Sequence, residues 1–103
     1  MSRSIDQVIE SYGKAKTQES ILEAEDFILN GIQKLTEQNF YKRVIQWDDL
    51  SCIADVYGII LDGKPWFVKF RIDFEEDLLE EISFHSPEAE FTTVGGIKIP
   101  VGG

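Results

Sequence analysis

Lys69, Arg71 and His85, the only histidine, are the side chains whose types and spacing could do chemistry. The two cations are two positions apart in a segment of alternating character, so both would point to one face of a strand. Cleavage of an RNA backbone needs a group that transfers a proton and positive charge that stabilises the pentavalent phosphate. We therefore expect His85 to act as acid or base and the cations to hold the phosphate, without a metal or other cofactor. In the alternative, Arg71 pairs with Glu81 across the strands and His85 lies at a solvated edge.

Two predicted hairpin turns set the register that would bring these side chains together. Asp62-Gly63 is typical of a two-residue hairpin turn because both positions favour positive φ. A second turn would pair Phe74 with Leu78. Asp55 and Glu80 would fall on the apolar face of this sheet, which requires a bulge or a position at its margin. The opposite face, called the outer face below, would hold the cross-strand pairs Gly58–Phe67, Val56–Lys69, Ala54–Arg71, Arg71–Glu81, Lys69–Ser83 and Phe67–His85.

Two amphipathic helices are predicted before the strands. The first covers residues 4–13 and begins with a capping box formed by Ser4 and Gln7. The second covers residues 17–35 and contains Gly31, which close packing against a neighbour would explain. Its inward stripe consists of Ile21, Ala24, Ile28, Ile32 and Leu35.

Three strands follow the helices, at residues 52–61, 66–73 and 78–85, with a candidate fourth strand at 96–99. The chain is therefore predicted to have an α+β fold, in which two N-terminal helices pack on an antiparallel three- to four-stranded sheet. The length of 103 residues suits a single domain. We expect a helical part at residues 1–37, the sheet at 40–86, and an acidic to flexible tail at 87–103.

The acidic residues are concentrated in the last third of the chain. Residues 73–103 contain eight acids and one base, a net charge of −7, against −2 for residues 1–72. A protein that grips phosphates over a wide surface should be basic, so bulk electrostatics do not favour nucleic acid binding. The acids either keep a small protein in solution or form a docking face for a basic partner. The candidate docking residues are Glu75, Glu76, Asp77, Glu80 and Glu81.

The remaining composition points to the cytoplasm. No apolar run approaches the length of about 18 residues that indicates a membrane span, and we expect no membrane partner. The N-terminus lacks the basic and then apolar pattern of a secretory signal. Cys52 is the only cysteine and has no internal disulfide partner. Trp47, beside two aspartates, is predicted to be partly buried under the sheet, with a recognition role as the alternative.

The run from Leu35 to Lys42, Leu-Thr-Glu-Gln-Asn-Phe-Tyr-Lys, resembles a signature of the MqsR family of type II toxin–antitoxin mRNA interferases. The similarity covers about residues 20–86 and keeps the order of the family's motifs. It implies a RelE-like fold, mRNA cleavage and a cognate antitoxin. The further matching segments are Asp55-Val56-Tyr57, Val68-Lys69 and Ile82-Ser83-Phe84.

The chain departs from the family at three positions of the expected site. Ala54, Gly58 and Phe67 stand where the family has a glutamine, an arginine and a tyrosine. Lys42 and Tyr41 keep the family pattern. Arg71 and His85 would have to restore an equivalent set elsewhere on the outer face for the chain to cleave RNA.

Two functions follow from these observations. The first is a toxin-like ribonuclease, in which Lys42, Lys69 and Arg71 neutralise the phosphate and His85 moves the proton. Tyr41, Tyr57 or Phe67 would then stack on a base of the RNA. The second is a non-catalytic acidic binding protein, such as an immunity protein, an antitoxin or a phage inhibitor, that docks on a basic nuclease or nucleoprotein. The expected partner is a cognate antitoxin or toxin protein, and a homodimer is also compatible with the sequence.

Overall fold

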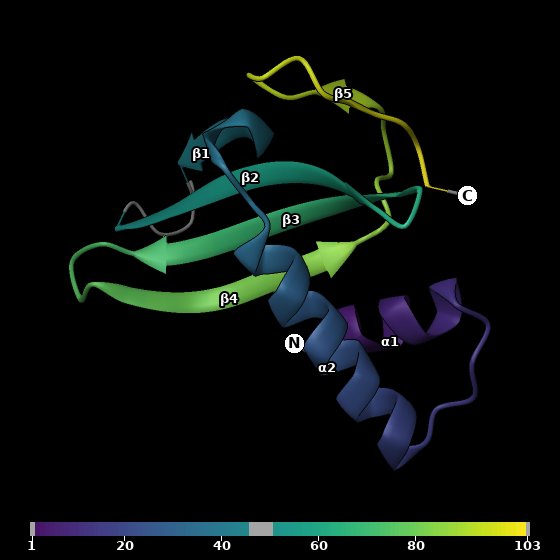
Figure 1. Cartoon of the computed structure of the whole chain (residues 1–103). Helices are drawn as coiled ribbons and strands as arrows, with labels where there is room; N and C mark the ends of the chain where they lie inside the picture. Colours follow the sequence, from purple (N-terminus) through teal and green to yellow (C-terminus); the bar gives the residue numbers. More distant parts are fainter. Residues whose placement is uncertain (1, 46–50, 103) are drawn as a thin grey trace.

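The computed structural model describes residues 2–45 and 51–102, and the interpretation of Trp47 lies outside these residues. Two helices precede a four-stranded antiparallel sheet of order β1-β2-β3-β4, which confirms the predicted α+β layout (Figure 1). A separate two-stranded sheet follows. The elements are α1 (Ser2–Ser11), α2 (Gln18–Gln33), the 3₁₀ helix η1 (Glu37–Asn39), β1 (Phe40–Ile45), β2 (Cys52–Leu61), β3 (Lys64–Asp73), β4 (Leu78–His85), β5 (Phe91–Thr92) and β6 (Lys98–Ile99).

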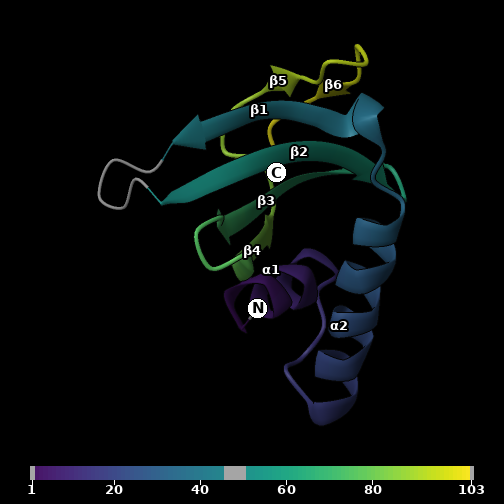
Figure 2. The ribbon, with the colours of Figure 1, turned by 90° about the vertical axis from the view of Figure 1, so that its left-hand side faces the viewer.

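Both helices pack against one face of the sheet, here called the inner face (Figures 1 and 2). Ile28 of α2 is fully buried among Trp66, Val68 and Phe84 of the strands. Gly31 allows this approach, because a Cβ at its position would lie 2.9 Å from Leu61 Cδ1 and 3.2 Å from Phe84 Cζ. The close packing expected at this glycine is therefore confirmed.

The start of α1 differs from the prediction. The helix already begins at Ser2, so Ser4 is not its N-cap. Ser4 is instead buried against β4, where its Oγ accepts a hydrogen bond of 2.9 Å from the backbone N–H of Phe84. Among the described strands β4 lies at the edge of the sheet, and a small hydroxyl from α1 accepts this N–H.

The start of α2 agrees with the prediction. Thr17 is its N-cap, and its Oγ1 accepts the N–H of Ser20 at 3.1 Å. The Ser20 hydroxyl accepts the N–H of Thr17 in return, at 2.7 Å. This reciprocal pair forms a capping box that satisfies two backbone donors at the start of the helix.

The predicted register is present at all six outer-face pairs. It differs at the second turn, where Leu78 pairs with Asp73 and not with Phe74. A bulge on β4 opposite Arg71 absorbs this shift of one residue. The bulge places Glu80 beside Arg71, with 3.3 Å between the Glu80 Oε2 and Arg71 Nε atoms. One of the two acids predicted on the apolar face is thereby moved to the outer face.

Asp55 remains on the inner face, as predicted, where it is buried and forms an ion pair with Arg43. Its carboxylate accepts hydrogen bonds from Arg43 Nε at 2.7 Å and from Nη2 at 3.0 Å. These bonds and the charge of the carboxylate raise the pKa of Arg43 above its ordinary value. Burial disfavours a charged carboxylate, and the two hydrogen bonds from the Arg43 guanidinium compensate this cost for Asp55.

The fourth strand of the main sheet is β1. The segment predicted to be a fourth strand, residues 96–99, instead contains β6, which forms a separate hairpin with β5. The hairpin of β5 and β6 lies beside β1, away from the two helices (Figure 2). The N–H of Val94 donates to the carbonyl of Phe40 at 2.7 Å, and the N–H of Gly95 donates to that of Gln38 at 3.1 Å. Ile99 is buried, with 1% of its surface exposed. Part of the segment predicted to be a tail is thus packed on the sheet.

Candidate functional site

Lys69 and His85 line one open groove of about 1170 Å³. The groove lies between β4, the neighbouring strand β3, the start of α1 and the end of the chain. The bases that line it are Arg3, Lys69 and His85, and the acids are Asp6, Glu81 and Glu88. The structure therefore brings two of the predicted catalytic residues to one groove, whose lining holds acids as well as bases.

The His85 ring is held by two contacts. It stacks on Phe67 with 4.6 Å between the ring centroids and 19° between the planes. Its Nδ1 lies 2.8 Å from the carbonyl oxygen of Ser86. Because a carbonyl oxygen only accepts, Nδ1 carries the hydrogen, and Nε2 is the proton acceptor of the neutral ring. The geometry leaves His85 with one nitrogen suited to proton transfer.

Arg71 does not line the groove with Lys69 and His85. Its Nε lies 3.3 Å from Glu80, and its side chain is only 28% exposed. The Cys52 thiol lies 3.6 Å from the same Glu80 carboxylate. Cys52, Asp73 and Glu80 have donor atoms within 4.8 Å of one another, a spacing that a metal ion could use. The guanidinium of Arg71 already supplies positive charge to Glu80, so we interpret this cluster as structural.

Lys42 and Tyr41 lie on the other side of the outer face. Lys42 shares a row of the sheet with Val56 and Lys69, so one strand separates the two lysines. At a strand spacing of about 4.8 Å, their backbones are roughly 10 Å apart. Lys42 Nζ lies 5.3 Å from the centroid of the Tyr41 ring, and that ring packs on Phe91 at 4.5 Å. Neither residue lines the groove that contains His85.

Tyr57 points to the inner face, opposite to the other predicted aromatic residues. Its ring contacts Phe40 and Phe70 at 5.5 and 5.6 Å between centroids. It also packs against the hydrophobic core. Since successive side chains of a strand point to opposite faces, the thickness of the sheet separates Tyr57 from Lys69 and His85.

The three positions that depart from the resembled family are filled by apolar packing. Ala54 is buried, and Phe67 carries the stacked His85 ring. Gly58 is covered by Phe91 and Ile99 of the C-terminal hairpin. Sequence reasoning missed this cover, although the glycines at 95 and 96 between two apolar segments are a turn signal.

A second candidate site lies at the turn between β3 and β4, which projects at one end of the sheet away from the helices (Figure 1). The turn is ordered by Asp73, whose Oδ1 accepts the N–H groups of Glu75 and Glu76 at 3.0 and 3.2 Å. All five predicted docking acids are exposed, three of them in this turn and two, Glu80 and Glu81, in the first residues of β4. Three apolar side chains accompany them and are about half exposed: Phe74 (54%), Leu78 (53%) and Leu79 (53%). We call these eight residues, 74–81, the acidic tip.

Sequence reasoning identified the acids of the tip and missed its apolar members. The signal was present, because Phe74, Leu78 and Leu79 interrupt a run of charged residues without continuing the alternation of the strand. Exposed apolar side chains that cluster within a polar surface are typical of interaction sites.

Comparisons with models of protein families, with curated proteins and with solved structures give no match for this chain. The resemblance to MqsR toxins therefore stays a prediction. Among the residues that the structure describes, no helix is both long enough and apolar enough to cross a membrane.

Proposed function

We propose that this chain is a non-catalytic binding protein that docks on a basic protein partner through the acidic tip. The observation that carries the proposal is the combination of five exposed acids with three half-exposed apolar side chains at the β3–β4 turn and the start of β4. Apolar contact area supplies affinity at an interface, and complementary charge supplies orientation and a faster association.

The charge distribution supports a basic partner. The net charge of the whole chain is −9, and residues 73–103 contribute −7 of it. Such a field attracts a basic surface and repels nucleic acid. A nuclease or nucleoprotein with an exposed basic and apolar surface is the partner class that fits the tip.

The outer face offers less to a nucleic acid than its sequence suggests. Phe91 and Ile99 cover the sheet at Gly58, and Glu80 compensates the charge of Arg71. The cover reduces the accessible area of the sheet, and the ion pair reduces its positive charge, which an RNA backbone needs. They favour binding through the tip over catalysis on the sheet.

The proposal is tested by affinity capture from cells of the source, followed by identification of what each form retains. The tip variant combines Glu75→Gln, Glu76→Gln and Asp77→Asn. The control variant combines Glu10→Gln, Glu19→Gln and Asp26→Asn, which removes the same charge from exposed positions on the helices. We expect one basic protein to be retained by wild type and the control but not by the tip variant. Equal retention by all three forms, or no specific protein on wild type, contradicts the proposal.

A second candidate function is the metal-independent ribonuclease of a toxin–antitoxin system, which the MqsR resemblance implies. It is favoured by one observation, that Lys69 and His85 line the same groove with Nε2 of His85 suited to proton transfer. Incubation of RNA with the purified protein tests it, beside His85→Ala, Lys69→Ala and Lys42→Ala. Cleavage that is lost in His85→Ala would favour the ribonuclease, and intact RNA with wild type would exclude it.

A further inference from the structure

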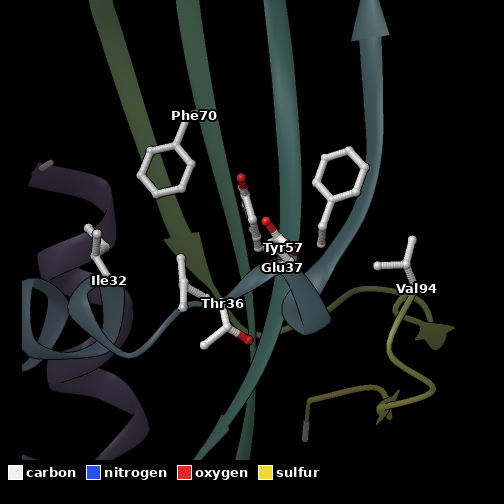
Figure 3. Close-up of a pocket in the computed structure, with 8 residues that line it drawn as sticks. Ile32, Thr36, Glu37, Tyr57, Phe70 and Val94 are labelled. Carbon is white, nitrogen blue, oxygen red and sulfur yellow. The ribbon is translucent and has the colours of Figure 1, made fainter.

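A pocket on the inner face lies beyond the end of α2, between η1 and strands β1 to β3. Its volume is about 640 Å³, within the range of roughly 300–1,000 Å³ that is typical of small-molecule sites. Figure 3 shows Ile32 and Val94 on opposite sides of it, with Phe70 and Tyr57 between them. The residues that line it are Ile32, Leu35, Thr36, Glu37, Phe40, Tyr57, Phe70 and Val94.

Three aromatic rings from three neighbouring strands form the floor of this pocket. Phe40 and Tyr57 are 5.5 Å apart between centroids and inclined at 73°. Tyr57 and Phe70 are 5.6 Å apart and inclined at 77°. Rings that stand nearly perpendicular to one another present faces in more than one direction around a shared space. All three rings are half-buried, so part of each remains accessible to a ligand.

The charge of the pocket favours a positively charged ligand. Glu37 is exposed, and among the described residues that line the pocket it alone has an acidic or basic side chain. Arg43, the nearby base on the inner face, is bound to Asp55 through two hydrogen bonds. The faces of aromatic rings are negative and attract cations. A carboxylate beside such faces therefore disfavours phosphates and carboxylates and favours a positive group.

The apolar character of the lining selects the kind of cation. A primary ammonium or a metal ion holds its water strongly, and this lining offers few oxygen atoms to replace that water. An ammonium that carries alkyl groups is weakly hydrated and contacts aromatic faces through its methyl or methylene groups. Ile32, Leu35 and Val94 then provide apolar contact for the remainder of such a molecule.

We propose that this pocket binds a small organic cation with an alkylated ammonium head, held between the aromatic rings and Glu37. The proposal is independent of the acidic tip, which lies on a different turn. It also gives a role to Tyr57, which the fold separates from the groove of His85.

The test is a titration of the isotopically labelled protein followed by NMR. The probes are choline and 3,3-dimethylbutan-1-ol, which has the same shape with a neutral carbon in place of the charged nitrogen. We expect choline to bind saturably, with shifts at the residues of the pocket, and the neutral analogue to bind at least about fivefold more weakly. A trimethyllysine peptide forms a further arm, and tighter binding of that peptide than of choline would identify a protein side chain as the source of the cation.

Two variants distinguish the pocket from general attraction to an acidic protein. Glu37→Gln keeps the shape of an exposed side chain and should weaken choline binding by about fivefold. Glu19→Gln removes one charge from the start of α2 and should leave the affinity unchanged. Equal affinity for choline and its neutral analogue, equal effects of the two variants, shifts outside the pocket, or no saturation would each overturn the proposal.

Discussion

Gly58 lies directly beneath Ile99, so closely that a Cβ at Gly58 would approach Ile99 Cγ1 to 2.6 Å. The Phe91 ring closes the same position, with its Cε2 atom 2.7 Å from that Cβ. The resemblance to MqsR toxins assigns an arginine to this place. In this chain the place is filled by the C-terminal hairpin, which converts part of a candidate catalytic surface into a packed interface.

Gly58→Ala is expected to destabilise the protein by about 1–3 kcal/mol, because the added methyl overpacks the contact with β5 and β6. Urea unfolding measures the change in the free energy of unfolding. Thr92→Ala is the control, since it alters an exposed residue of the same hairpin. An unchanged midpoint for Gly58→Ala would show that the hairpin does not press on the sheet as described.

Ser4→Ala is expected to lower the free energy of unfolding by about 1–3 kcal/mol, because the buried N–H of Phe84 would lose the hydroxyl that accepts its hydrogen bond. Gln7→Ala, at an exposed position of the same helix, should change stability little. Hydrogen exchange provides a second readout, since the amide of Phe84 should lose protection in Ser4→Ala. Retained protection at that amide would argue against the contact between α1 and the edge of β4.

Thr17→Ala is expected to lower the free energy of unfolding by about 1 kcal/mol, because the start of α2 loses its capping oxygen. Thr17→Ser keeps the oxygen and should remain close to wild type. Thermal unfolding of the three proteins checks this prediction. Equal loss in both variants would mean that the methyl group of the threonine matters and that the cap does not.

Tyr12 should make stability depend on alkaline pH. Burial raises the pKa of its hydroxyl above the ordinary value, and so does Asp62, which accepts its hydrogen bond at 3.3 Å. The folded state therefore binds this proton more tightly than the unfolded state, so its contribution is complete below about pH 10 and is lost as the pH rises through the higher value. Urea midpoints at about pH 8 and pH 11 measure the loss. Wild type should lose more stability than Tyr12→Phe, and equal losses would contradict the assignment.

The parts of the fold that local patterns determine could be predicted from the sequence. The Asp62-Gly63 turn and the alternation of β3 predict the three outer-face pairs of β2 and β3, which the structure contains. The three predicted pairs of β3 and β4 are also present, although the pairing of Phe74 with Leu78 from which they follow is not. The helical spacing of apolar residues predicts a start of α2 near Thr17, and Thr17 is its N-cap in the structure. The residues that make these interactions are close together in the sequence, and the same local motifs occur in many proteins.

The parts that depend on distant segments could not be predicted in the same way. Serine is a common N-cap residue, but the hydroxyl of Ser4 accepts a hydrogen bond from the N–H of Phe84, which lies 80 residues away in the sequence. The bulge that moves Glu80 follows from the way the second turn closes, and the covering of Gly58 depends on where the C-terminal hairpin packs. The candidate site differs most from the sequence prediction at these positions, because the residues that cover a surface come from segments far away in the sequence.

The affinity of the captured basic partner for the acidic tip tests the central claim most directly. Titration calorimetry would compare wild type, the triple tip variant and the triple control variant of equal charge, each at low and high salt. The account predicts that the tip variant binds at least about tenfold more weakly at low salt and loses most of its salt dependence, while the control stays near wild type. Equal affinities for the tip and control variants would contradict it.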